Sequence, residues 1–387
     1  MHLIKTILLL LLFVMSTSNS ETINTYNGNV NFYYISKLSD QSIINLPYRL
    51  VNLNIDHQNG DLMIRSTLAL EHKLREDTYF LSNNSPTDFE LDMRELYLQL
   101  FTSWGEFRIG KIIHTLGNAD ENSPLDIASP FDYYYTFDSG INKKLGIFSS
   151  ALDIYTNNMK FGLIFSPLHN THRTPQDDDD FPIKLPVSLT EDQIIKIKGL
   201  PYEFSAYINR SFSFGDISLN YFNGYDRLFN LSGVNVFKNQ SEVSTDIDIL
   251  YGYRKTNMFG FGSTLFFGSL EFRADVAVFD TEDENNNISR EHPKLPEFYD
   301  SLHYSYPLNE KAKYFQSTLQ VEIKLPLDIK FVGQFFNYDT LDYSSDSLPL
   351  DNDVSIPNLE ISVDELDPKN IFTPGYGSSL GILTKKA

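Results

Sequence analysis

Apolar and polar residues alternate with a period of two along many stretches of this chain, each about ten residues long. The clearest stretches are residues 62–71, 246–253, 270–278 and 318–325. Successive side chains of a β-strand point to opposite faces, so each stretch predicts a strand with one apolar and one polar face. A tilted strand of about this length is also long enough to cross a lipid bilayer.

The predicted strands are joined alternately by tight turns and by long polar segments. Tight turns are expected at residues 57–60, 103–105, 157–158, 214–215, 267–268 and 326–328. Long segments are expected at residues 74–88, 116–143, 168–200, 226–244, 281–313 and 341–375. This alternation is typical of outer-membrane barrels, whereas long structureless loops are uncommon in compact soluble domains.

The pattern therefore predicts an all-β fold, a transmembrane antiparallel β-barrel of about 14–16 strands with short periplasmic turns and long extracellular loops. The expected strands are residues 27–37, 46–56, 61–73, 89–101, 105–115, 144–155, 159–167, 201–213, 216–225, 245–266, 269–280, 314–325, 329–340 and 376–387. We interpret the long segment 245–266 as one strand that extends above the membrane. A hairpin near Arg254–Thr256 is the alternative, but it would break the alternation of turns and loops.

The two ends of the chain carry further expectations. Residues 1–20 predict a secretory signal peptide, with Lys5 before the apolar run 7–15 and small residues before Glu21. An uncleaved N-terminal anchor is the alternative. The domain expected after the signal is a single barrel over residues 21–387. Barrels of this kind usually end on an aromatic residue that the insertion machinery reads, and this chain ends Leu383–Ala387. We therefore expect a fragment that lacks its last strand or strands.

The amino-acid composition excludes several classes of function and fold. The formal net charge of −20 argues against nucleic acid as a partner, because phosphates are bound by Lys and Arg. The chain has no Cys, which excludes disulfides and thiolate metal sites. It has 30 Phe and 23 Tyr against one Trp, and such aromatic richness in an exported, acidic chain fits a soluble β protein or an outer-membrane barrel.

Most of the candidate functional residues lie in the hairpin formed by the expected strands 89–101 and 105–115 and in the polar segment that follows it. If Leu98 lies opposite Phe107, Tyr97 lies opposite Arg108, and the hairpin has an apolar and a charged face. The segment 116–143 could fold inward as a constriction, and its acidic residues would then favour cations. The expected pore-lining residues are Glu95, Tyr97, Arg108, Asp120, Asp126, Asp132, Glu271, Arg273, Asp275, Glu322 and Lys324. The run Tyr133–Tyr135 fits a sugar-stacking face or, as the commoner case, an interfacial aromatic girdle.

No pattern in the chain indicates catalysis or a resident metal. His169 and His172, followed by Asp177–Asp180, have the composition of a loose metal site, but we interpret them as part of a solvated loop. His114 lies near a strand end without an identifiable partner, and no nucleophile elbow or phosphate-binding loop is present. We expect no catalytic residue, no metal ligand and no cofactor.

The residues around this hairpin also resemble a known family. Residues 108–111 (RIGK), 117–120 (GNAD) and 130–132 (PFD) resemble the R-I-G-K, G-x-A-D and P-x-D motif of a largely uncharacterised porin-like outer-membrane family of Gram-negative bacteria, similar to alginate-export and porin-type barrels. The chain departs from that pattern at Leu116, where the family usually has Trp, and at Glu121, where it often has Gly. The resemblance covers about 40 residues and implies a barrel with passive transport, and it supplies no substrate.

We therefore expect an outer-membrane porin-like channel, single or trimeric, for passive diffusion of small polar solutes. Its expected partners are outer-membrane lipid, the solute and the barrel insertion machinery. One alternative is an export or lipid-handling barrel that works with periplasmic partners, for which Val332 and Phe336 supply some apolar lining. Another is a secreted soluble β protein that binds glycans.

Overall fold

A computed structural model describes residues 22–44, 46–73, 89–135, 138, 140–174, 191–238, 245–293, 304–326, 329–346 and 375–384. The expected signal peptide, the run Asp177–Asp180 and the last three residues lie outside this part. Within it, the fold is all-β and antiparallel. The helical elements described are single 3-10 turns, η2 (Tyr133–Tyr135), η3 (Gly140–Lys143) and η4 (Glu191–Gln193). No helix in the described part is both long and apolar enough to span a membrane.

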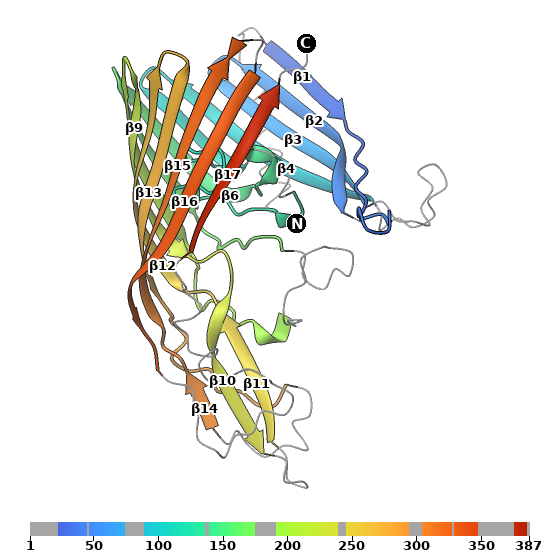
Figure 1. Ribbon diagram of the computed structural model, residues 1–387, viewed down its shortest axis with the longest axis vertical. Helices are drawn as coiled ribbons and strands as arrows, with labels where there is room; N and C mark the ends of the chain where they lie inside the picture. The colour runs from blue at the N-terminus through green and yellow to red at the C-terminus, as the bar shows by residue number, and fades with distance from the viewer. Residues whose placement is uncertain are drawn as a thin grey trace.

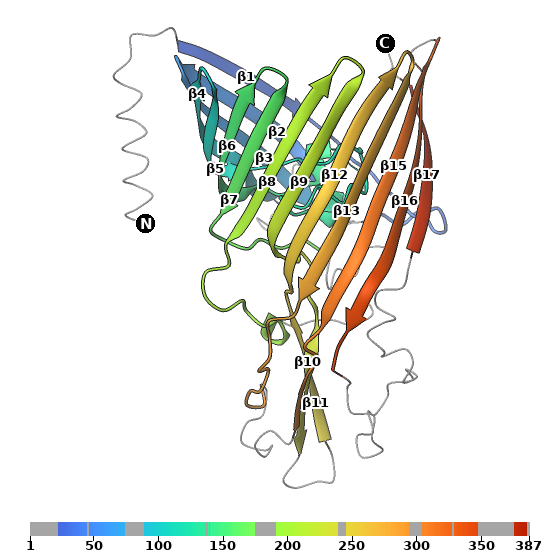
Figure 2. The same cartoon turned by 90° about the vertical axis from the view of Figure 1, so that its left-hand side faces the viewer.

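The main sheet has fourteen strands, and each pairs with the next in chain order apart from the three strands of a second sheet. Its strands are β1 (Thr22–Val30), β2 (Pro47–Asn59), β3 (Leu62–Lys73), β4 (Phe89–Thr102), β5 (Gly105–Ile112), β6 (Ile147–Thr156), β7 (Met159–Ser166), β8 (Glu203–Phe212), β9 (Gly215–Tyr225), β12 (Lys255–Phe267), β13 (Leu270–Glu282), β15 (Lys311–Leu325), β16 (Ile329–Ser344) and β17 (Gly375–Thr384). The sheet curves into a barrel wall, with the tight turns at one end and the long connections at the other (Figures 1 and 2). The expected barrel architecture of about 14–16 strands is confirmed. β1 and β17 are the two edges of the wall, and no pairing between them is seen among the described residues.

Apolar and charged side chains are distributed over the two faces of the wall in the reverse of the way found in a soluble protein. The convex outer face carries large apolar side chains in contact with solvent, among them Leu219 (57% exposed), Phe259 (66%) and Phe335 (44%). On the inner face Asp275 and Glu322 are 0% and 1% exposed. Soluble proteins rarely expose apolar patches this extensive, whereas a membrane barrel presents such a band to lipid.

A second, three-stranded sheet projects beyond the wall at the end that carries the long connections (Figures 1 and 2). It consists of β10 (Asn230–Lys238), β11 (Thr245–Gly252) and β14 (Tyr304–Pro307). The interpretation of 245–266 as one strand is therefore wrong, because β11 belongs to this sheet and β12 to the wall. The break falls at Tyr253–Arg254, where the buried Arg254 binds Asp226 and Glu310.

Two smaller expectations also differ from the structure. The first strand occupies residues 22–30 rather than 27–37. In the β4–β5 hairpin, Leu98 lies opposite Ile109 and Gln99 opposite Arg108, because the two-residue turn falls at Ser103–Trp104. A shift of two residues keeps every side chain on its face, so Leu100 and Phe107 still point outward and Tyr97 still points inward.

The exposed apolar face predicts that a charged substitution will destabilise the protein more on the wall than outside it. We expect Leu219→Arg, at the centre of β9, to lower the free energy of unfolding in lipid vesicles by about 2–4 kcal/mol. Urea titration monitored by the fluorescence of Trp104, the chain's one Trp, measures this change. Leu228→Arg is the control, because Leu228 is also exposed but follows β9 outside both sheets. Equal effects of the two substitutions would contradict a lipid-facing wall.

Candidate functional site

The chain leaves the wall after β5 and returns to it at β6. The described residues between these strands, the inner segment (113–135, 138 and 140–146), lie on the concave side of the wall (Figures 1 and 2). Pro124 and Pro130 lack the backbone N–H that a ladder requires, so this stretch cannot continue as a central strand. The inner segment contacts the inner faces of strands from β2 to β16. The expectation that residues 116–143 fold inward agrees with this arrangement.

Asp275 of β13 is the main anchor of the inner segment on one side of the barrel. Its carboxylate accepts hydrogen bonds from the backbone N–H groups of Asn118 and Ala119, each at 2.8 Å. It also accepts from the Asn118 amide at 2.8 Å and the Ser123 hydroxyl at 2.7 Å. Asp275 is completely buried, and four donors satisfy a carboxylate that would otherwise be costly to bury.

Two glycines of β12 make this close approach possible. A Cβ atom at Gly260 would lie 2.1 Å from Leu125, and one at Gly262 would lie 2.1 Å from the Asn118 amide. Leu125 is completely buried and packs with Phe222 and Met258 on the inner face. The wall is therefore shaped to receive the inner segment at this point, with an apolar contact beside a polar one.

Polar side chains of the neighbouring strands extend this contact. Asp120 forms an ion pair with Arg273 at 2.6 Å and accepts from the Gln320 amide at 2.7 Å. Arg273 also binds Glu271 at 2.6 Å. Gln334 of β16 donates to the carbonyl of Glu121 at 2.7 Å. Asp120 is 49% exposed despite its partners, so this ion pair borders open space.

Arginines hold the inner segment from the other side. Arg49 of β2 donates to the carbonyl of Asn142, and Arg94 of β4 donates to the carbonyl of Ile141 at 2.7 Å. Arg227, which follows β9, donates to the carbonyls of Ile127 and Ala128 at 3.1 and 2.9 Å. All three guanidinium groups are buried, so the segment is fixed to the wall at both of its ends and near its centre.

The acidic residues expected to line the pore differ in their surroundings. Lys144, itself 1% exposed, forms an ion pair with Asp126, and burial lowers the pKa of Lys144 although Asp126 opposes this effect. Asp132 is 1% exposed and lies 3.2 Å from Arg173. Burial raises the pKa of Asp132, and Arg173 partly offsets that rise. Asp126 and Asp132 are thus enclosed in ion pairs, whereas Asp120 and Glu121 border open space.

The expected pore-lining residues on the wall strands all lie on the inner face, but most of them form hydrogen bonds or ion pairs with other residues of the chain. Glu95 accepts from the backbone N–H of Ile113 at 3.0 Å, and Tyr97 accepts from Arg65 at 3.4 Å. Arg108 binds Asp153 at 2.7 Å. The buried Glu322 binds Lys330, and Lys324 is exposed near the turn that follows β15.

The run Tyr133–Tyr135 does not form an interfacial girdle. Tyr135 is buried on the inner side, where its hydroxyl donates to Glu71 at 2.7 Å and the Arg49 guanidinium lies 3.7 Å from its ring centre. Tyr133 packs edge-on against His172. The preference for a girdle is therefore wrong, because the inner segment carries these rings away from the outer face.

The histidines serve as hydrogen-bond partners of the inner segment and wall. His172 Nδ1 accepts from the backbone N–H of Phe131 at 2.7 Å, and His169 Nδ1 lies 2.9 Å from Glu203. His114 Nε2 lies 2.8 Å from the Ser149 hydroxyl, and burial lowers the pKa of His114 to about 3. No group of residues that could hold a metal ion occurs in the described part of the chain.

Several anchoring residues were not foreseen from the sequence. Arg94 and Glu95 both face inward because the β3–β4 ladder shifts register at Thr67–Leu68, and a simple alternation would send one of them outward. Arg49 and Arg227 meet carbonyls about one hundred residues away in the chain. The only available signal was their charge on or beside a predicted strand.

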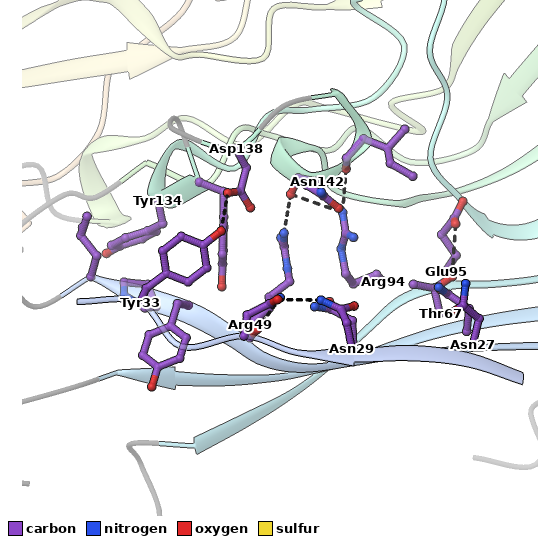
Figure 3. Close-up of a pocket in the computed structure, with 18 of the residues that line it drawn as sticks. Asn27, Asn29, Tyr33, Arg49, Thr67, Arg94, Glu95, Tyr134, Asp138 and Asn142 are labelled. Carbon is purple, nitrogen blue, oxygen red and sulfur yellow. Dashed lines mark hydrogen bonds between the residues drawn. The ribbon is translucent and has the colours of Figure 1, made fainter. Parts of the chain in front are cut away.

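A cavity of about 590 Å³ remains between the inner segment and the inner faces of β1–β4 (Figure 3). Asn27, Asn29 and Thr67 line it from the wall, and Tyr134 and Asn142 line it from the inner segment. The inner segment therefore fills the side of the barrel formed by β9–β16 and leaves space on the opposite side.

No protein-family model and no curated protein matches the chain, so the resemblance of residues 95–135 to a porin-like family stays a prediction. Solved structures with similar folds include the anion-selective porin from Comamonas acidovorans, with 10% identity, a TM-score of 0.43, and 83% of this chain and 80% of that chain covered. OmpF of Salmonella typhi in complex with daunomycin has 10% identity, a TM-score of 0.41, and 83% and 79% covered. The outer-membrane channel DcaP of Acinetobacter baumannii has 11% identity, a TM-score of 0.31, and 84% and 92% covered.

The four hydrogen bonds that Asp275 accepts predict that its removal will loosen the inner segment. We expect Asp275→Ala to reduce the hydrogen-exchange protection of the backbone amides of residues 118–119 by about 10–100-fold, because hydrogen bonds to a charged group are lost. Mass spectrometry of the peptide that contains these residues measures the change. Asp280→Ala on the same strand is the control, because Asp280 is 59% exposed. Unchanged protection in Asp275→Ala would show that the segment is held by other contacts.

His172 predicts a dependence of this anchoring on pH. Burial and the nearby Arg227 lower its pKa to about 3, so folded His172 is neutral where the unfolded residue, with a pKa of about 6.5, begins to protonate. The folded state then binds fewer protons, and stability falls as the pH falls from about 6.5 to about 3, by at most about 1.4 kcal/mol per pH unit. The His172→Asn variant keeps an acceptor for Phe131 that does not titrate. We expect a flatter dependence of its unfolding free energy on pH, and parallel curves for the two proteins would contradict this role.

Proposed function

We propose that this chain is an outer-membrane channel through which small polar solutes diffuse passively. The observation that carries the proposal is the reversed distribution of side chains, with apolar residues such as Leu219 and Phe259 exposed outside and charged residues such as Asp275 buried inside. Exposure of this apolar face to water would be unfavourable, whereas its contact with lipid stabilises the fold. The inner segment then forms the constriction of a water-filled passage.

In this mechanism the solute moves down its concentration gradient and no bond is made or broken. The inner segment sets the width of the passage, and the cavity along β1–β4 is the space that it leaves. The half-exposed acids Asp120 and Glu121 favour cations along the passage, and each has a basic partner, Arg273 and Lys143 respectively. Charges of both signs at a constriction orient polar solutes as they pass.

The lipid-handling alternative is less well supported. It requires a continuous apolar track, and Val332 and Phe336 on β16 are half-buried residues within a strongly polar inner face. A soluble glycan-binding protein would leave the apolar outer face in water, where it would promote aggregation.

Expression with the full N-terminal sequence in a Gram-negative host tests the proposal. We expect the protein in the outer-membrane fraction, with faster electrophoretic migration before boiling than after it. In planar lipid bilayers the purified protein should produce stepwise conductance in potassium chloride. Recovery of a folded, soluble protein from the periplasm or medium would contradict the proposal, and so would a folded membrane protein that never conducts.

Ion selectivity provides a sharper test of the constriction. A unit charge about 5 Å from the ion path contributes about 0.8 kcal/mol in water, which corresponds to about a fourfold change in relative permeability. We expect Asp120→Asn combined with Glu121→Gln to lower the ratio of cation to anion permeability by at least this factor, measured from reversal potentials in a salt gradient. Asp246→Asn is the control, because Asp246 is half-exposed on β11 outside the wall. An unchanged ratio in the double variant would remove the inner segment from the ion path.

A further inference from the structure

The cavity beside the inner segment is lined by an ordered array of amide side chains, which we call the amide groove (Asn27, Asn29, Asn31, Asn52 and Asn54). Strand register aligns these residues in rows across the wall. Asn27 lies opposite Asn54 and Asn29 opposite Asn52, so two pairs of amides are adjacent. The first row continues across β3 and β4, where Asn54 lies opposite Thr67 and Thr67 opposite Glu95.

Three amides of the groove have free hydrogen-bonding capacity. Asn29 donates to Asn31 at 2.8 Å, and Asn31 donates to the carbonyl of Arg49 at 3.4 Å. Among the described residues, no protein group pairs with the side-chain amides of Asn27, Asn52 and Asn54. Each such amide offers two donors and one acceptor toward the cavity.

The charged groups that border the same cavity are already engaged. Arg65 binds Asp56 through two hydrogen bonds, at 2.7 and 2.8 Å. Arg49 and Arg94 donate to carbonyls of the inner segment, and Thr67 donates to Glu95 at 3.4 Å. Three arginines and three acidic residues line the cavity, so their formal charges balance, and the groove between them presents neutral groups that both donate and accept.

Aromatic rings lie at one end of the groove. Tyr33 and Tyr134 line the cavity on the far side of Arg49 from Asn27 and Thr67 (Figure 3). Tyr33 is 48% exposed, and its hydroxyl lies 3.5 Å from Asp138. An exposed tyrosine ring offers a flat apolar surface together with a polar group.

We propose that the amide groove binds neutral polyhydroxylated solutes, such as linear oligosaccharides, during their passage through the channel. Vicinal hydroxyl groups both donate and accept, which matches the amides of Asn27, Asn52 and Asn54, and the C–H faces of a sugar ring match the tyrosines at the end of the groove. This inference rests on the proposed channel function and specifies the class of solute at the same site.

Current recordings in planar bilayers with maltohexaose as the probe test this inference. We expect the sugar to cause transient blockades of the potassium chloride current. Asn27→Ala combined with Asn54→Ala should shorten the blockades by about tenfold, because two hydrogen bonds to the sugar are lost. Asn209→Ala on β8 is the matched control, because it also removes an inner-phase amide from the wall, but one that does not line the groove.

The outcomes separate the solute class from the channel itself. Conductance without blockades by maltohexaose, or blockades of unchanged length in the double variant, would overturn the groove as a sugar site and leave the channel intact. Longer blockades by the anionic trimer of galacturonic acid would also overturn it. Absence of any conductance would count against the channel, and calorimetric titration of the detergent-solubilised protein with maltohexaose would then test the groove alone. Binding that the double variant abolishes supports the groove, and no binding overturns it. Unchanged circular dichroism and heat-dependent migration confirm that the variants fold.

Discussion

A wall with apolar side chains outside must place its polar side chains inside, and there they need partners. β13 shows the consequence most clearly, because Glu271, Arg273 and Asp275 all point from one strand into the barrel. An unpaired charge at a position as buried as Asp275 would cost several kcal/mol. The inner segment supplies the missing partners, with backbone and side-chain donors that converge on this one carboxylate. The same contacts that satisfy the buried charges of the wall therefore fix the position of the inner segment.

The inner segment is attached in a way that leaves one side of the barrel open. Asp275, Gln320 and Gln334 hold its first part against β13, β15 and β16. Arg49 and Arg94 hold its last part through backbone carbonyls, which they reach from β2 and β4. The space between these attachments borders β1–β4, where the amides of Asn27 and Asn54 face the cavity. In the channel that we propose, a fixed constriction of this kind would select solutes by width and surface chemistry.

The period-two pattern carried most of the information about the wall. It located twelve of the fourteen wall strands closely, and it identified residues such as Leu96 and Ile109 as outward-facing, because the alternation of apolar and polar residues shows directly which face of a strand is apolar. It failed at 245–266, where the alternation continues across Arg254 although the chain passes from one sheet to another. A pattern that reports which residues share a face contains no information about which sheet that face belongs to.

The contacts of the candidate site were harder to predict from the sequence than the strands of the wall. The charge of Asp120, Asp126 and Asp132 was visible, but their partners Arg273, Lys144 and Arg173 could not be assigned, because the pairs depend on how the inner segment folds. The contact of Asn118 with Asp275 spans 157 residues, and the glycines that permit it lie on another strand. The amide groove was not recognised, because its register depends on a first strand that was placed five residues too late.

We infer that one face of the wall meets lipid and the other meets water, and the absence of Cys from the sequence allows single labels to measure this directly. Single Cys substitutions at positions 52, 53, 54 and 55 of β2, each carrying a nitroxide label, can be examined in lipid vesicles by electron paramagnetic resonance. We expect accessibility to alternate along the strand, with positions 52 and 54 accessible to a water-soluble nickel relaxant and positions 53 and 55 accessible to oxygen dissolved in lipid. Access of the nickel reagent to all four positions would contradict it.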